Sequence, residues 1–219
     1  MKQVKKLNNQ KAHKQISSND SFIIGVDEVG VSALAGPLYA CATYLISALP
    51  DSIYQEVKDS KLLSPKKREI LARELKKYCC YSFGSVSSKE LRYLNLHQAR
   101  MLAMSRAIDR LYLSGIPDLI IFDGTHVPIK YQGIGVPVIG ADNIFLPVAI
   151  ASILAKVRRD SIMVKLHNLY PHYDWASNKG YPAPNHWQGI ERFGLCPLHR
   201  TERFTRLREE ERHAKEEIS

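Results

Sequence analysis

The sequence contains few cysteines and no long apolar run. Its four cysteines, Cys41, Cys79, Cys80 and Cys196, form no C-x-x-C pair and have no zinc-finger spacing, so neither a disulfide framework nor a cysteine zinc site is indicated. A reduced, cytoplasmic setting is therefore predicted. No apolar segment approaches the roughly 20 residues of a membrane span, and the N-terminus lacks the apolar core of a signal peptide, so no membrane partner is expected.

Acidic residues are outnumbered by basic ones. Lys and Arg total 31 against 22 Asp and Glu, which gives a net charge of +9 and a pI near 9.4. An excess of this size favours polyanionic partners, of which nucleic acid is the commonest. Residues 1–20 carry five lysines against the single acid Asp20 and have no hydrophobic periodicity, so they are predicted to form a disordered basic arm.

The remaining chain alternates apolar runs with amphipathic segments. We expect strands at "FIIGVD", "PLYACATYLI", "YSFGSVS", "DLIIFDG" and "VPVIGAD". Helices are predicted over 64–78, with Ser64 as N-cap and Pro65 at the first helical position, over 87–115, over 146–170, and briefly after residue 189. Early strands followed by strand–helix alternation predict one mixed α/β domain.

Two apolar stretches end in a carboxylate followed closely by glycine. One leads into Asp27 and Glu28 before Gly30, and the other ends at Asp123 before Gly124. Ligand sites of α/β sheets lie at strand ends, so we expect these acids to converge. Taken alone, a strand-end Asp is more often a turn residue than a catalyst.

Asp160 is a further acidic candidate. It shares one face of the predicted helix with Ser152 and Lys156 at i, i+4 spacing. Because it follows Arg158 and Arg159, the simpler interpretation is a set of surface ion pairs.

Together these acids form a set of hard oxygen ligands that suits Mg²⁺ or Mn²⁺. Divalent cations would offset the repulsion between Asp27 and Glu28. Two such ions about 4 Å apart can clamp the attacking water and the leaving oxygen of a phosphodiester. With the basic charge, the acids therefore predict metal-dependent hydrolysis of nucleic acid.

Several ordered blocks make the sequence resemble type 2 ribonuclease H, ribonuclease HII. The match runs from about Phe22 to Leu207, and its blocks are "GVDEVG…LAGPLYACA", "DSKLLSPKKREIL", "LNLHQARMLAMSRAI", "FDG", "ASILAKVRRDSIM", "YPHYDWASNKGY" and "GLCPLHR". The resemblance implies a catalytic domain over 21–207, with a charged C-terminal tail at 208–219.

The resemblance also implies a fold and an activity. The fold is ribonuclease H-like, an α/β fold with a mixed five-stranded sheet flanked by helices and a C-terminal helical segment. The activity is cleavage of RNA in RNA–DNA hybrids, and 5′ of a ribonucleotide embedded in duplex DNA, leaving 3′-hydroxyl and 5′-phosphate ends. The family's metal-binding acids fall on Asp27, Glu28, Asp123 and Asp160, and its substrate-reading tyrosine falls on Tyr181.

The chain departs from the family at the turn after the paired acids. The family's G-R-G-P is here Gly30-Val31-Ser32-Ala33. Loss of the arginine removes a charged phosphate contact worth about 1.5–3 kcal/mol, and Ser32 adds a Cβ that disfavours positive φ. Because the 2′-hydroxyl distinguishes RNA from DNA, we expect weaker handling of a single embedded ribonucleotide. Backbone donors at Val31 and Ser32 do not depend on these side chains.

Lys61 and Lys156 are further candidate phosphate contacts by their positions in the matching blocks, although an exposed lysine without a specific partner is nearly as common. The substrates implied are RNA–DNA hybrid or ribonucleotide-containing duplex DNA, and a replication or repair partner bound through a terminus stays open. Two alternatives also stay open: a nucleic-acid-binding protein of the same fold with lost cleavage, and a related DNA nuclease. The acids argue against a pure binder because they repel phosphate.

Overall fold

The computed structural model describes residues 22–111 and 115–200. These residues fall into two compact units, which are described separately. The first unit takes its described residues from Met1–Val29, Tyr39–Ser85 and Met101–Val157, and the second from Gly30–Leu38, Val86–Arg100 and Arg158–Ser219. The predicted arm at 1–20 and tail at 208–219 lie outside the described residues. Within the part described, no helix is long and apolar enough to cross a membrane.

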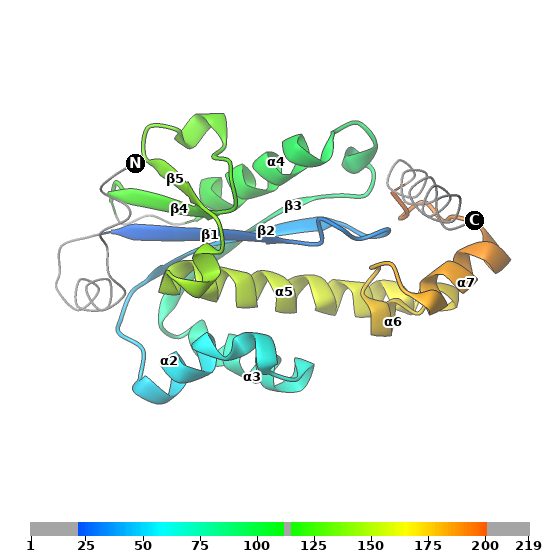
Figure 1. The fold of residues 1–219 in the computed structure, drawn as a ribbon, viewed down its shortest axis with the longest axis horizontal. Coiled ribbons are helices and arrows are strands. Elements are labelled where there is room, and N and C mark those ends of the chain that lie inside the picture. The colour runs from blue at the N-terminus through cyan, green and yellow to red at the C-terminus, as the bar shows by residue number, and fades with distance from the viewer. Residues whose placement is uncertain (1–21, 112–114, 201–219) are drawn as a thin grey trace, which may run out of the picture. The chain divides into compact units, whose positions relative to one another are not determined.

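The first unit contains a mixed five-stranded sheet in the order β3-β2-β1-β4-β5 (Figure 1). β1 is antiparallel to β2 and parallel to β4, which is parallel to β5. The strands are β1 (Ile23–Val29), β2 (Leu38–Leu45), β3 (Cys79–Val86), β4 (Leu119–Asp123) and β5 (Gly135–Val138). Their apolar, β-branched residues suit a sheet covered on both faces.

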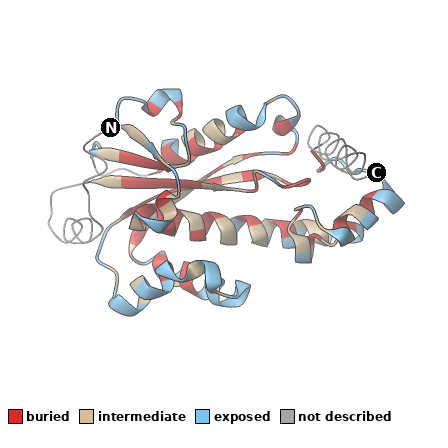
Figure 2. Ribbon diagram, viewed as in Figure 1, coloured by how far each residue is buried: buried red, intermediate tan, exposed pale blue. Residues whose placement is uncertain are grey.

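Helices cover both faces of this sheet, with α4 on one side and α5, α2 and α3 on the other (Figure 1). The helices are α2 (Asp51–Lys58), α3 (Pro65–Leu75), α4 (Leu96–Asp109) and α5 (Leu146–His167). A Cβ at Gly25 would lie 2.3 Å from the backbone nitrogen of Val148, so the start of α5 packs directly on β1. Buried residues of β2, β3, α2, α3 and α5 form one hydrophobic core of this unit, and Figure 2 shows buried residues along the sheet and α5.

The second unit is helical and is built around Trp175. Its helices are the start of α4, the end of α5, α6 (Trp175–Asn178) and α7 (Pro184–Phe193), with a 3₁₀ turn at Pro171–Tyr173. Trp175 is fully buried and stacks on Tyr173 with ring centroids 5.2 Å apart. Leu34, Ala35, Met163 and Ile190 complete this core.

The predicted mixed five-stranded sheet flanked by helices is confirmed. Ser64 caps α3 as predicted and accepts a hydrogen bond from the Lys67 N–H. The helix predicted over 87–115 is wrong at its start, because a 3₁₀ turn at Glu90–Arg92 precedes α4. Asn95 and Gln98 form a capping box there, each side chain accepting from the other's N–H. The last helix begins earlier than predicted, at Pro184, and α2 was not predicted.

Candidate active site

Two carboxylates occupy equivalent positions on adjacent strands. The parallel pairing of β1 with β4 ends at Val26 and Phe122, so Asp27 and Asp123 are the next residues on each strand. Neighbouring residues in register point to the same face of a sheet. The structure thus brings together two acids that lie far apart in the sequence.

Glu28 lies within β1, opposite Ala40 of β2, because the strand continues to Val29. The paired acids are therefore inside the strand, not at its tip. Successive strand residues point to opposite faces, so the Asp27 and Glu28 side chains leave the backbone in opposite directions. The Glu28 N–H donates to Asp27 Oδ1 at 2.7 Å, which partly offsets the cost of the paired charges.

Asp27 is 7% exposed, and its environment favours the protonated form. Burial is the main cause of a pKa raised from 3.8 to about 7. A hydrogen bond with the Ser152 side chain on α5 lowers this pKa, while the charges of Glu28 and Asp123 raise it. Three carboxylates of the first unit therefore act on one another electrostatically.

Asp123 is half-buried and held by the backbone. Its Oδ1 accepts a hydrogen bond from the Ala141 N–H at 2.8 Å. The next residue, Gly124, has a φ of +109° and donates its N–H to the Val138 carbonyl at 3.0 Å. This turn, which glycine adopts without strain, fixes the carboxylate at the end of β4.

The donor set formed by Asp27, Glu28 and Asp123 fits Mg²⁺ or Mn²⁺, which prefer carboxylate oxygens. A divalent cation would relieve the repulsion that raises the pKa of Asp27. Among the described residues, no three His, Cys, Asp or Glu side chains are already grouped as a metal cage. The fit therefore rests on the chemistry of the donors and the buried charge.

Asp160 belongs to the second unit, on the part of α5 that follows Val157. It is half-buried, and its charge favours the charged form of Arg159. Its i, i+4 spacing from Lys156 places the two side chains on one face of the helix, as predicted.

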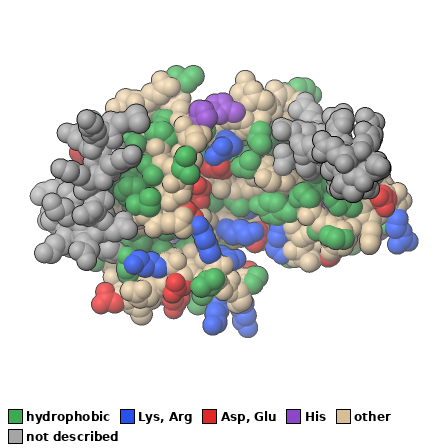
Figure 3. All heavy atoms as spheres, viewed as in Figure 1, with side chains coloured by type: hydrophobic (Ala, Val, Ile, Leu, Met, Phe, Trp, Pro, Cys, Tyr) green, Lys and Arg blue, Asp and Glu red, His purple; other side chains and the backbone are tan. Residues whose placement is uncertain are grey.

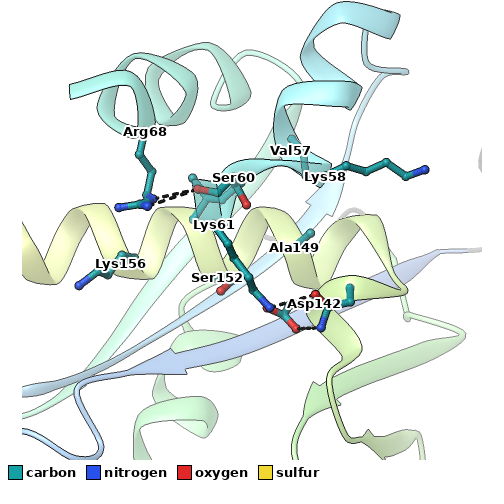
Figure 4. A pocket seen from close by; sticks show the side chains of 11 residues that line it. Val57, Lys58, Ser60, Lys61, Arg68, Asp142, Ala149, Ser152 and Lys156 are labelled. Carbon is teal, nitrogen blue, oxygen red and sulfur yellow. Dashed lines mark hydrogen bonds and ion pairs between the residues drawn. The ribbon is translucent and has the colours of Figure 1, made fainter. Parts of the chain in front are cut away.

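Lys61 and Lys156 line one pocket of about 230 Å³ in the first unit (Figure 4). Lys61 has two specific partners, because its Nζ lies 2.8 Å from Asp142 Oδ2 and 2.9 Å from Asn143 Oδ1. The remaining lining residues include the basic Lys58 and Arg68. Lys and Arg side chains also gather near acidic ones on the face shown in Figure 3. The pocket has the charge to receive a phosphate.

Arg68 braces the segment that carries Lys61. Its Nη2 donates to the carbonyl of Leu63 at 2.8 Å and to that of Ser60 at 3.3 Å. Figure 4 shows this contact beside Lys61. The 3₁₀ turn at Ser60–Leu62 is thus fixed from α3.

In the second unit, Gly30, Val31 and Ser32 begin the segment GVSALAGP, residues 30–37, here called the GVS turn. Gly30 is buried with a φ of +89°, and a Cβ there would lie 2.2 Å from Nε of Arg159. Val31 is half-buried and Ser32 is exposed. In the described part of the chain, the only residues other than glycine with positive φ are Asp174 and Lys179. Ser32 therefore fits its backbone without the strain expected from the sequence.

Tyr181 lies in the segment Lys179–Tyr181, here called the KGY loop. The Arg159 guanidinium stands 5.0 Å from the centre of the Tyr181 ring, within the range of a cation–π contact. Gly180 has a φ of +79°, and a Cβ there would meet the Ala35 carbonyl oxygen at 2.6 Å. The KGY loop therefore packs against the GVS turn.

Two buried histidines support the KGY loop from behind. The Cys196 N–H donates to His199 Nδ1 at 3.0 Å, so the proton of neutral His199 is on Nε2, which lies 3.1 Å from His186 Nε2. His186 Nδ1 donates to the Tyr181 carbonyl at 2.9 Å, and its Nε2 also accepts from Trp175 Nε1 at 3.0 Å. Burial lowers the pKa of both rings, that of His199 to about 4, so both stay neutral.

The sequence showed no metal-binding spacing for these histidines and left a structural role open. Its simpler interpretation, surface ion pairs with Arg158 and Arg159, does not hold for Arg159, because that side chain is fully buried and donates to three carbonyl oxygens. Arg200 is also buried and donates to the GVS turn. The only signal in the sequence was their presence in the blocks "ASILAKVRRDSIM" and "GLCPLHR", since nothing local marks a buried arginine.

Comparison with known proteins gives close relatives over most of the chain. One, described as Ribonuclease HII of Anaplasma phagocytophilum, is 39% identical over 182 residues, which cover 83% of this chain and 85% of that protein. Another, Ribonuclease HII of Paracoccus denitrificans, is 41% identical over 186 residues, or 84% of this chain and 86% of that protein.

Solved structures of this family are also similar to this chain. The PCNA:RNase HII complex from Archaeoglobus fulgidus matches with a TM-score of 0.70 and 25% identity, over 82% of this chain and 93% of that chain. Ribonuclease H2 from Pyrococcus horikoshii OT3 matches with a TM-score of 0.68 and 26% identity, over 81% and 92%. The family model for Ribonuclease HII matches residues 24–208. By sequence and by structure, this chain belongs to the ribonuclease HII family.

Proposed function

We propose that this chain is a divalent-metal-dependent endonuclease that hydrolyses the RNA strand of RNA–DNA hybrids, leaving 3′-hydroxyl and 5′-phosphate ends. The observation that carries the proposal is the buried Asp27, whose pKa of about 7 reflects burial and the neighbouring carboxylates Glu28 and Asp123. A protein that only bound nucleic acid would be hindered by such a cluster, because it repels phosphate. Membership of the ribonuclease HII family gives the substrate class.

Asp27, Glu28, Asp123 and Asp160 are the residues proposed to hold Mg²⁺ or Mn²⁺. When bound, the metal supplies a more acidic water and charge stabilisation at the leaving oxygen. Ser152 and the Ala141 N–H orient Asp27 and Asp123. Asp160 is included for its position in the block "ASILAKVRRDSIM".

The pocket lined by Ser152, which hydrogen-bonds Asp27, is proposed to bind a phosphate of the substrate. Lys61 and Lys156 supply the positive charge, and Asp142 and Asn143 hold the Lys61 ammonium in place. Direct hydrolysis of this kind needs no nucleophilic side chain.

Reading of the ribonucleotide is assigned to Gly30, Val31, Ser32 and Tyr181. The family's arginine is absent from the GVS turn, so incision at a single embedded ribonucleotide is proposed to be weaker than cleavage of a uniform hybrid. The reason is the lost charged hydrogen bond and not backbone strain, because Ser32 does not adopt a positive φ.

The preferred metal, the partner and the compartment are also proposals. The similar ribonuclease HII from Archaeoglobus fulgidus was solved in complex with PCNA, which supports a replication partner, here bound through a terminus. A cytoplasmic location is supported by the four cysteines, all of which are free thiols.

The test compares Asp123→Asn with Asp118→Asn on an end-labelled uniform hybrid, on a duplex with one ribonucleotide and on a branched all-DNA substrate, in Mg²⁺ and in Mn²⁺. Asp118 is an exposed acid before β4 that accepts from the Phe22 N–H, so its variant is the matched control. Asp123→Asn should lose cleavage but keep hybrid binding, and Asp118→Asn should keep both. Substantial turnover by Asp123→Asn would refute the metal assignment, and preference for branched all-DNA substrates would indicate a DNA nuclease.

A further inference from the structure

Arg200 binds the carbonyl oxygens of the GVS turn from inside the second unit. Its side chain is 7% exposed. Nη1 donates to Gly30 and Val31 at 2.7 and 3.2 Å, and Nε and Nη2 both donate to Gly36 at 3.0 and 2.8 Å. Its backbone N–H donates to the Leu34 carbonyl at 2.8 Å. Four carbonyl oxygens of one short segment are thus bound by one residue.

Arg159 binds the other end of the same segment. Its Nε and Nη2 donate to the carbonyls of Pro37 and Ala35 at 3.0 and 3.2 Å. Its Nη1 donates to the Lys179 carbonyl at 2.9 Å, and the guanidinium stacks on Tyr181. Because a buried guanidinium must be compensated by hydrogen bonds, these carbonyls are held firmly, and Arg159 joins the GVS turn to the KGY loop.

The two arginines determine which backbone groups of the turn remain available. From residue 33 onward the N–H groups are used internally: Ala33 donates to Gly30, Leu34 and Ala35 to Gly180, and Gly36 to Leu198. The N–H groups of Val31 and Ser32 have no hydrogen-bond partner within residues 22–111 and 115–200. Ser32 is exposed, so a ligand can reach this position.

We propose that Arg159 and Arg200 are positioning residues for ribonucleotide recognition, which rests on the proposed function. By binding the carbonyl oxygens of the GVS turn, they leave two successive N–H groups, at Val31 and Ser32, for the 2′-hydroxyl or phosphate oxygens of the substrate. Successive backbone N–H groups form a site for such oxygens, and this site does not depend on the side chains at positions 31 and 32. The preference that remains without the family's arginine therefore comes from these two N–H groups, which the buried arginines position.

The test measures binding by fluorescence anisotropy in EDTA, where cleavage does not occur. The full-length protein is titrated into an all-DNA duplex and into the same duplex with one ribonucleotide. The readout is the Kd for the all-DNA duplex divided by the Kd for the ribonucleotide duplex, so a higher ratio means a stronger preference for the ribonucleotide. Arg200→Lys keeps the charge but loses the forked hydrogen bonds. We expect the ratio to fall by about tenfold, or to one if the starting ratio is smaller, as for loss of a charge-assisted hydrogen bond.

Two further variants separate recognition from folding. Arg192→Lys is the matched control, because Arg192 is exposed at the end of α7, and its ratio should be unchanged. Ser32→Pro removes one of the two N–H donors at an exposed position while leaving the arginines in place. It should lower the ratio even if Arg200→Lys fails to fold.

The inference is overturned if the ratio of Ser32→Pro or of folded Arg200→Lys equals that of the unmodified protein, or if that protein itself has no preference. Cleavage of a uniform hybrid in Mg²⁺ is measured in parallel. Normal cleavage with unchanged ratios refutes the inference alone. A protein that prefers the ribonucleotide duplex but cuts neither substrate refutes the proposed hydrolysis and supports the role of the arginines.

Discussion

Removing the negative charge of Asp27 should make the metal-free protein more stable while abolishing its activity. Asp27→Asn keeps the size of the side chain and its hydrogen bond with Ser152. In the absence of metal, the ionised carboxylate is buried beside Glu28 and Asp123. The amide carries no charge and avoids this cost.

The magnitude follows from the pKa. Raising it from 3.8 in the unfolded chain to about 7 in the folded protein corresponds to about 4 kcal/mol, at about 1.4 kcal/mol for each pKa unit. The folded state binds the proton more tightly, so this stability is present below pH 3.8 and is lost as the pH rises to about 7. At pH 8 the Asn variant should therefore gain up to about 4 kcal/mol, reduced by about 1 kcal/mol for the imperfectly bonded amide.

The assay is urea unfolding followed by circular dichroism, in EDTA at pH 5 and pH 8 and with added Mg²⁺ or Mn²⁺ at pH 8. We expect the gain of Asp27→Asn at pH 8 to shrink at pH 5, where Asp27 of the unmodified protein keeps most of its proton. The metal should stabilise the unmodified protein more than the variant. A variant that is less stable at pH 8 in EDTA, or whose gain does not change with pH, would refute the electrostatic account of the acid cluster.

Three further results are expected. Lys61→Ala should raise the KM for a hybrid and lower the salt dependence of binding by about one phosphate contact. The free energy of unfolding should change by less than about 1 kcal/mol, because the ion pair with Asp142 is partly exposed. An unchanged KM would show that Lys61 is not part of the site. The free energy of unfolding of the unmodified protein, measured relative to His199→Gln, should fall by up to about 3 kcal/mol between pH 6.5 and pH 4, because the folded protein resists protonation of His199, whose pKa is lowered to about 4. Urea melts of both proteins at each pH measure this difference, from which the opposite contribution of Asp27 cancels, and a difference that does not change with pH would contradict it. Gly30→Ala should destabilise the protein by about 1–3 kcal/mol, because φ is +89° and the new Cβ would meet Arg159; an unchanged thermal midpoint would contradict this geometry.

The five strands and the starts of α3 and α5 could be predicted because their signals are local. Apolar runs marked β1 and β4, and Ser64 followed by Pro65 marked the start of α3. The boundary before α4 was missed because apolar residues continue at helical spacing across Asn95, whose cap is visible only from its bonds with Gln98.

The nearness of Asp27 and Asp123 could be predicted, since the ends of adjacent parallel strands meet at one edge of the sheet. Their grouping with Asp160 as metal ligands stays a prediction. The partner of Lys61 could not be predicted, because Asn143 lies 82 residues away in the sequence and no local pattern in either segment indicates that the two are in contact. The role of Arg159 was obscured for a related reason. Charged neighbours on both sides suggested a solvated helix face, whereas tertiary packing buries this one side chain.

The in-register pairing of β1 and β4 makes catalysis sensitive to strand alignment. If β1 slipped by one residue, Asp27 would point away from α5 and Glu28 would take its place, because side chains alternate between faces. The same slip would bring Ile24 or Val26 to the position of Gly25, where the backbone of Pro147 and Val148 leaves no room for a Cβ. Nuclease activity would therefore report whether the sheet has folded in its correct alignment, and a misaligned chain would be excluded by crowding before it could bind a substrate.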